Sequence, residues 1–194
     1  MTATISKIIW LVGLFIFVTL RIGPRLRSRK TPVRHSERGL REAAFVGCTL
    51  TGFGIVPLVY VATGFPQFAN YPFLPAQGYL GTIVWIAALW LLYRTHRDLG
   101  RNWSMSLDVR EQHTLITTGV YTHVRHPMYS AFWLMGTAQL LLLPNWFAGP
   151  AGLIGFSVLF FGRVRREEEM MIGAFGDEYR AYMRRTARVM PWVY

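Results

Sequence analysis

Long uncharged apolar stretches constrain this chain more than any other feature. Hydrophobic residues make up 52% of its 194 residues and charged residues 16%, so it is more apolar than an ordinary soluble domain. A helix needs roughly 20 apolar residues to cross a bilayer, and shorter stretches must tilt or use flanking aromatic residues. We therefore predict an all-α, polytopic membrane helical bundle with about five transmembrane helices and a cytoplasmic C-terminal helical segment. The five stretches are residues 5–20, 43–64, 78–93, 129–143 and 147–162.

The positions of the charged residues predict a topology. A net charge of +11 is compatible with a nucleic-acid surface, but alternating spans would place twenty of the twenty-one Lys and Arg residues, and every Asp and Glu, on one side. The opposite loop, "FPQFANYPFLPAQ", carries no charge. This asymmetry follows the positive-inside rule and predicts the N-terminus outside and the C-terminus in the cytoplasm. We expect membrane lipids, and not nucleic acid, as partners.

The N-terminal region is predicted to be a retained anchor followed by a connector. "RIGPRLRSRK" offers no small-residue site for cleavage of a secretory signal. Pro24 and Pro32 are expected to interrupt any long helix in the surface connector 21–42. Cys48 lies within the second apolar stretch, and we interpret it as a small buried hydrophobic residue. With no repeat or low-complexity linker, residues 1–194 are expected to form a single domain, with its cofactor-binding part at about 94–194.

The first polar segment, residues 94–126, ends at the start of the fourth apolar stretch. It turns at Gly100 and then shows the short strand-like or extended stretches "WSMSLDV" and "HTLITTGVY". Pro127 suits the first position of a helix, which places His126 at the N-cap. Such a helix start offers N–H groups and a partial positive charge, so it can receive an anionic group between Arg125 and His126.

The second polar segment continues the fifth stretch out of the membrane as a helix. Arg163 and Glu167 are four residues apart and therefore share one face of that helix. Carboxylates beside a membrane surface need a partner or water, so Glu167 and Glu168 are candidates for binding a cationic ligand group. Each feature also has a simpler interpretation. The histidine would only cap a helix, the alternating arginines and glutamates would form an ion-paired solvated face, and the terminal aromatic residues would form an interfacial belt. A metal site built from His113, His123 and His126 is disfavoured by their spacing, and no metal is predicted.

Three motifs together resemble a known family. "HRDLGRNWS" (96–104), "GVYTHVRHPMY" (119–129) and "RVRREEEMMIGAFGDEYRAYMRRTARVMPW" (163–192) are similar to the isoprenylcysteine carboxyl methyltransferase and phospholipid methyltransferase superfamily of integral membrane enzymes. The resemblance covers about the C-terminal half of the chain. The first two apolar stretches match only in hydropathy.

The resemblance implies S-adenosylmethionine as the methyl donor. Cations and N–H groups near Arg125 and His126 suit its carboxylate, whereas carboxylate and aromatic groups suit its ammonium and sulfonium. The candidate catalytic residues depend on the acceptor: Arg163 would hold a carboxylate acceptor, and Glu167 would accept the proton that an amine acceptor loses. The residues implied for cofactor binding are His113, Leu115, Gly119, Tyr121, Arg125, His126, Tyr129, Glu167 and Glu168.

The acceptor is left open by the sequence. The resemblance favours carboxyl O-methylation of a prenylcysteine-like substrate that enters from the bilayer, while a phospholipid amine remains an alternative. Two further alternatives are an NADPH-dependent enzyme similar to the sterol reductases and a non-enzymatic membrane accessory protein. The oligomeric state is also open, with a compact monomer as our preference.

Overall fold

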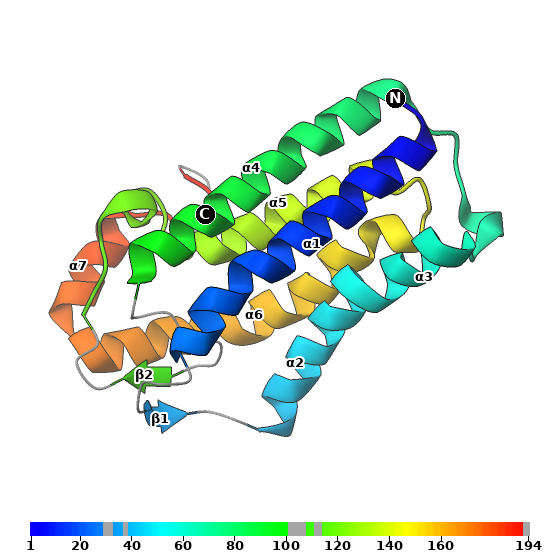
Figure 1. Ribbon diagram of the computed structural model, residues 1–194. Coiled ribbons are helices and arrows are strands. Elements are labelled where there is room, and N and C mark those ends of the chain that lie inside the picture. The colour runs from blue at the N-terminus through cyan, green and yellow to red at the C-terminus, as the bar shows by residue number, and fades with distance from the viewer. Residues whose placement is uncertain (29–32, 37–38, 101–107, 111–113, 192–194) are drawn as a thin grey trace.

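The computed structural model describes residues 1–28, 33–36, 39–100, 108–110 and 114–191 (Figure 1). Most of these residues are helical, as predicted. The α-helices are α1 (Ala3–Ser28), α2 (Leu40–Leu50), α3 (Val56–Thr63), α4 (Pro75–Leu99), α5 (Pro127–Leu142), α6 (Ala148–Phe175) and α7 (Asp177–Arg185). A π-helical turn, η1 (Thr51–Ile55), joins α2 to α3, and two 3-10 turns are η2 (Gln67–Ala69) and η4 (Gly119–Thr122). The strands are β1 (Val33–Ser36) and β2 (Asp108–Arg110).

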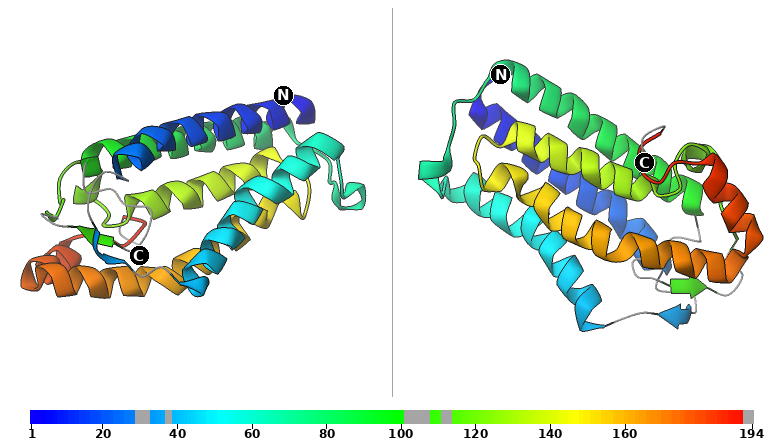
Figure 2. Two further views of the ribbon diagram at one scale, coloured as in Figure 1. Left: turned by 60° about the horizontal axis from the view of Figure 1, so that its bottom comes forward. Right: turned by 180° about the vertical axis from the view of Figure 1, so that it is seen from behind.

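The long helices run alongside one another, with α5 between α4 and α6 (Figures 1 and 2). The N-terminus and the α3–α4 and α5–α6 connections lie at one end of the bundle, whereas α7 and the two strands lie at the other (Figure 1). Apolar side chains from α1, η1, α3, α4, α5 and α6 share one core. Its largest fully buried members include Trp10, Tyr60, Met135, Phe156 and Phe160.

Small residues let the α2–η1 segment pack closely on α6. A Cβ atom added to Gly155 would lie 2.4 Å from the carbonyl oxygen of Cys48, and one added to Gly52 would lie 2.2 Å from that of Ala151. Gln139 of α5 supports the same contact, since its side-chain amide donates to the Gly52 carbonyl at 3.1 Å. Close backbone approach through small residues is typical of helix packing in membranes. Here it fixes the position of α2 and η1 on α6.

Three segments of the described chain are long and apolar enough to cross a membrane, namely Ala3–Pro24, Leu40–Thr63 and Pro75–Leu99. These confirm the first three predicted stretches as span candidates. The fourth and fifth form α5 and the first part of α6, which are joined by the short connection 143–147. The 16 residues of α5 are about 24 Å long at 1.5 Å per residue. That α5 and α6 cross the bilayer stays a prediction.

The structure corrects several local predictions. Helix α1 continues through Pro24 to Ser28, so this proline does not end it; it removes only one hydrogen bond near the final turn. Cys48 is exposed and not buried, because it lies on the outer face of α2. Within "HTLITTGVY", Gly119 begins a 3-10 turn instead of extended chain. β1 was not predicted; it pairs antiparallel with β2, which lies partly within the predicted extended stretch "WSMSLDV".

Candidate active site

The start of α5 is fixed by the end of the chain. His126 is the N-cap of α5 and Pro127 its first residue, which confirms the predicted helix boundary. A C-terminal strap, residues 186–190, runs beside this boundary. The N–H groups of Arg125 and His126 donate to strap carbonyls at 2.9 and 3.0 Å, and the Ser130 hydroxyl donates to a third. The strap therefore occupies two of the N–H groups that we had considered for anion binding.

Glu168 of α6 holds the arginine and histidine of this motif together with the strap. Its carboxylate accepts hydrogen bonds from Arg125 Nε at 2.6 Å and from Arg188 Nη2 at 2.6 Å, and His126 Nε2 lies 3.4 Å away. Burial alone would raise the pKa of Glu168, but the hydrogen bonds from His126, Arg188 and Arg125 outweigh it and lower that pKa below its ordinary value. Glu168 is therefore ionised, only 5% exposed, and committed to positioning these cations.

A second cluster surrounds Arg163, one turn earlier on α6. Its Nε donates to Glu167 at 2.9 Å, so the predicted pair between residues four apart is present. Its Nη1 donates to Glu42 of α2 at 2.8 Å. Glu167 also faces His126, with Glu167 Oε2 3.6 Å from His126 Nδ1. Arg163 is buried, and its two carboxylate partners come from different helices, which restricts its guanidinium to one orientation.

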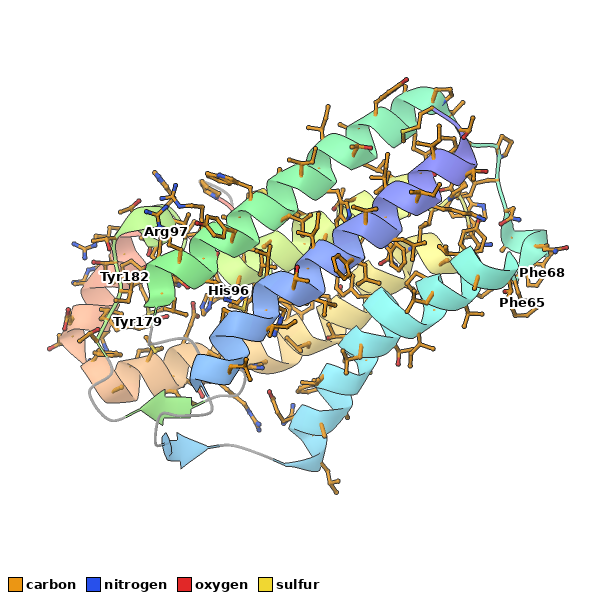
Figure 3. All side chains as sticks on the ribbon, viewed as in Figure 1. Phe65, Phe68, His96, Arg97, Tyr179 and Tyr182 are labelled. Atoms are coloured by element: carbon orange, nitrogen blue, oxygen red, sulfur yellow. The ribbon has the colours of Figure 1, made fainter. Side chains whose placement is uncertain are left out.

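Tyr121 is held by elements on either side of η4. Asp98 of α4 accepts the Val120 N–H at 2.9 Å, and Gly119 has a φ of +64°, which favours glycine. From α7, the Tyr182 hydroxyl donates to the Tyr121 carbonyl at 2.6 Å. Figure 3 shows Tyr182 on α7 at the end of the bundle opposite Phe65. Burial raises the pKa of Tyr182 to about 12, so this phenol keeps its proton and remains a donor.

These groups border a cavity of about 440 Å³, a volume typical of small-molecule sites. One part of its lining is polar and includes Arg125, His126, Arg163 and Glu167. The other part is apolar and is built by α1, α2, η1, α5 and α6. It includes Phe17, Val46, Leu50, Phe53, Phe132, Phe156 and Leu159. A charged region therefore meets an apolar region within one space.

The cavity brings together most of the residues predicted for the site. Tyr121, Arg125, His126, Tyr129, Arg163 and Glu167 all line it. Glu168 lies behind this wall, through its contacts to Arg125 and His126. Among the described residues, Leu115 and Gly119 are not part of the lining, and His113, like Asn102 and Trp103, lies outside the described residues.

The sequence analysis missed several residues in the first two helices. Phe17 and Arg21 of α1 and Phe53 of η1 line the cavity, and Glu42 of α2 binds Arg163. Arg21 and Glu42 are the two end residues of the segment 21–42, which was predicted to be a surface connector. A charged residue at the edge of a predicted span was the available signal, but the sequence does not show which way it faces.

Part of the chain is similar to known proteins. The profile of the Isoprenylcysteine carboxyl methyltransferase (ICMT) family matches residues 79–173. Protein-S-isoprenylcysteine O-methyltransferase B of Arabidopsis thaliana is 34% identical over 102 residues, a match that covers 48% of this chain and 49% of the plant protein. The human protein-S-isoprenylcysteine O-methyltransferase is 34% identical over 85 residues, covering 43% of this chain and 29% of the human protein.

The solved structure of the eukaryotic intramembrane Ras methyltransferase ICMT superimposes with a TM-score of 0.52. That superposition covers 82% of this chain and 55% of the ICMT chain at 21% sequence identity, and it shows a shared fold. The chain is therefore similar to the isoprenylcysteine carboxyl methyltransferase family over just under half of its length. It matches less than half of the length of the Xenopus laevis, Dictyostelium discoideum and Arabidopsis thaliana family members. The profile match contains η4, α5 and most of α6, whereas α1 to α3 lie outside it.

Proposed function

We propose that this protein belongs to that family and transfers a methyl group from S-adenosylmethionine to the carboxylate of a lipophilic, prenylcysteine-like acceptor. The observation that carries this proposal is the cavity in which Arg125, His126 and the Arg163–Glu167 pair adjoin an apolar wall. A polar cofactor and an apolar acceptor need both kinds of surface in one space.

The described residues suit the chemistry of the donor. The side chains of Arg125 and His126 provide cationic groups for its carboxylate, and Glu167 provides a carboxylate for its ammonium. Tyr121 and Tyr129 offer aromatic faces for a sulfonium. We retain His113, Leu115, Gly119 and Glu168 as proposed members of the donor site, with Glu168 acting through the two cations that it positions.

The protein's contribution to the reaction is alignment. When bound, the donor supplies an electrophilic methyl group on sulfur. An acceptor carboxylate is ionised at neutral pH, so it would take the methyl group from sulfur, with a C–O bond replacing the S–CH3 bond, without any proton transfer. Arg163 would orient that carboxylate, and Glu42 and Glu167 keep its guanidinium in place. With an amine acceptor, Glu167 would instead accept the proton that the amine loses.

The apolar walls support entry of the acceptor from the bilayer. Helices α1 and α2 contribute Phe17, Val46 and Leu50 to the cavity. The segments that contain them, Ala3–Pro24 and Leu40–Thr63, are long and apolar enough to cross a membrane. We propose that the N-terminus is outside and that the C-terminus and the active site are cytoplasmic, where a water-soluble donor is available. A monomer contains every described residue of this site and remains our proposal.

Calorimetric titration of the detergent-purified protein with S-adenosylmethionine and, separately, with NADPH tests the cofactor. Binding of S-adenosylmethionine alone is expected, because the cationic side chains of Arg125 and His126 suit the single carboxylate of this donor. A donor-saturated assay then compares a prenylated thiol acid with a lipid amine, and the acid is expected to be methylated. Binding of NADPH alone would favour a reductase. Binding of neither cofactor would favour a non-enzymatic accessory protein. Methylation of the amine alone would favour a phospholipid methyltransferase.

A further inference from the structure

Four phenylalanines form the apolar end of the cavity. In α1, in the α2–η1 segment, in α5 and in α6, the lining residue farthest from the α7 end of the bundle is a phenylalanine (Figure 1). These residues are Phe17, Phe53, Phe132 and Phe156, and we call them the aromatic floor. The centre of the Phe132 ring lies 5.8 Å from that of Phe17, 5.9 Å from that of Phe53 and 5.2 Å from that of Phe156. The four rings therefore form one packed cluster that joins all four walls.

The protein core continues directly behind the aromatic floor. Met135 and Gln139 follow Phe132 on the same face of α5, and neither has any exposed surface. The Gln139 amide donates to a carbonyl of η1 at 3.1 Å and to one of α6 at 2.7 Å, which holds these elements together. A Cβ atom added to Gly152 would lie 2.7 Å from the Phe53 ring, so this ring already fills the space beside α6. An apolar chain that enters from the charged end therefore meets packed side chains at the floor.

Helix geometry gives the depth of the cavity above the floor. Phe156 precedes Arg163 by seven residues on α6, and Phe132 follows His126 by six at the start of α5. At 1.5 Å per residue, these separations correspond to about 10 Å and about 9 Å along the helix axes. An extended peptide advances roughly 3.3–3.6 Å for every three chain bonds, and an extended hydrocarbon chain has similar bond lengths and angles. The depth therefore matches a geranyl main chain of about eight carbons, whereas a farnesyl main chain of about twelve exceeds it.

A longer chain would gain little from this cavity. To pass the floor it would have to displace rings that are packed into the core, and such displacement costs packing energy. If it stayed above the floor, its additional carbons would remain outside the protein and would add no burial. The volume of about 440 Å³ has to hold reacting parts of both the donor and the acceptor, which also favours a short chain.

We infer that the aromatic floor, with Phe132 at its centre, determines acceptor specificity by limiting the apolar chain to about the length of a geranyl group. This inference rests on the proposed function and narrows it, because it selects one class among the prenylated acids. Phe17 and Phe53 lie outside the residues that match the family profile, so the profile contains only half of the floor.

The experiment compares the S-prenyl, S-geranyl and S-farnesyl derivatives of N-acetylcysteine in a donor-saturated methylation assay of the full chain, at constant detergent concentration. For wild type, kcat/KM is expected to rise about ten-fold or more from prenyl to geranyl, because a further isoprene unit is buried. No further rise is expected from geranyl to farnesyl.

Two substitutions should deepen the cavity. Phe132→Ala removes the central ring and should raise the ratio of farnesyl to geranyl kcat/KM about ten-fold. Phe53→Leu keeps an apolar side chain of smaller size, so it should change this ratio in the same direction by a smaller factor and preserve folding if Phe132→Ala does not. Calorimetric affinity for S-adenosylmethionine is expected to be unchanged in both, which separates a deeper acceptor site from general damage to the protein.

Phe45→Leu is the matched control. Phe45 lies on α2 and packs against the core, but it is not among the lining residues, so its replacement should keep the wild-type ratio. A wild-type rise from geranyl to farnesyl as large as that from prenyl to geranyl would overturn the inference and leave the proposed function intact. A wild-type ratio in folded Phe53→Leu would overturn it as well. Methylation of none of the three acids by a protein that binds the donor would instead contradict the carboxylate acceptor itself.

Discussion

Replacement of Glu168 by glutamine tests whether its carboxylate organises the site. The substitution preserves shape but removes the negative charge that faces Arg125 and Arg188, each 2.6 Å away. One guanidinium can still donate to the amide oxygen, whereas the amide nitrogen would face the other. The side chains of Arg125 and Arg188 are only 10% and 19% exposed, so water cannot fully compensate for the lost charge.

The magnitude follows from this burial. Removing one partner of a buried ion pair costs about 3–5 kcal/mol of unfolding free energy, because the remaining charge stays buried. For a chain of this size, 1 kcal/mol corresponds to about 2–4 °C in Tm, so Glu168→Gln should lower Tm by roughly 10 °C. Thermal unfolding in detergent, followed by tryptophan fluorescence, measures the shift. Affinity for S-adenosylmethionine should fall as well, since Arg125 and His126 lose their common anchor.

Glu169→Gln is the control, because Glu169 adjoins Glu168 on α6 but is exposed. It should change stability by less than about 0.5 kcal/mol. Equal Tm values for the two variants would refute the reasoning.

The same two variants also test how Glu168 makes the stability of the protein depend on pH. Because the folded pKa of Glu168 is lowered, its stabilisation is fully present above the ordinary carboxyl pKa of 4.5 and is lost as the pH falls toward the folded pKa. Glu168→Gln should lack this component of acid destabilisation, whereas Glu169→Gln should retain it.

Further predictions concern the turn, the topology and the reaction. Gly119→Ala should weaken donor binding and cost about 1–2 kcal/mol or more in stability, because its Cβ would lie 2.1 Å from the Asp98 carboxylate at a positive φ; calorimetry and thermal unfolding measure both effects. Thiols introduced in 65–77, but not in 25–35, should react with an impermeant maleimide from outside. Arg163→Lys should lower turnover in a donor-saturated assay while leaving the calorimetric donor affinity unchanged.

Local spacing made part of the site predictable. Pro127 directly after His126 fixed the start of α5, because proline suits the first helical position and disfavours helical backbone before it. The separation of Arg163 and Glu167 by four residues placed both on one face of α6. These relations depend on neighbouring residues, so an amino-acid sequence contains them directly.

The remaining contacts depend on how distant helices pack. Glu42 and Arg163 are 121 residues apart in the sequence, and nothing near either residue indicates the other. Arg21 and Cys48 illustrate a related difficulty, since hydropathy finds a span but not the face that each residue occupies. Arg21 faces inward and Cys48 outward, both opposite to the prediction. The orientation of α2 is set by its close approach to α6, which hydropathy does not describe.

Adjacent residues on α6 connect the two halves of the proposed site. Successive helical residues point about 100° apart, so Glu167 and Glu168 reach different partners from one turn. Glu167 binds Arg163, which we propose to orient the acceptor carboxylate, and Glu168 binds Arg125, which we propose to face the donor. His126 lies near both carboxylates, 3.6 Å from Glu167 and 3.4 Å from Glu168.

A displacement of α6 would therefore disturb both ligands, whereas loss of a single guanidinium should affect one. This difference gives a direct expectation for a double-mutant cycle on donor affinity. Arg125→Gln and Glu168→Gln act through one contact, so their effects should fall well short of additive. Arg41 is exposed and is not among the residues that line the cavity, so Arg41→Gln and Glu168→Gln should combine additively. Strong coupling in the second pair would contradict this reasoning, because an exposed arginine outside the cavity lining should not change how Glu168 supports the donor.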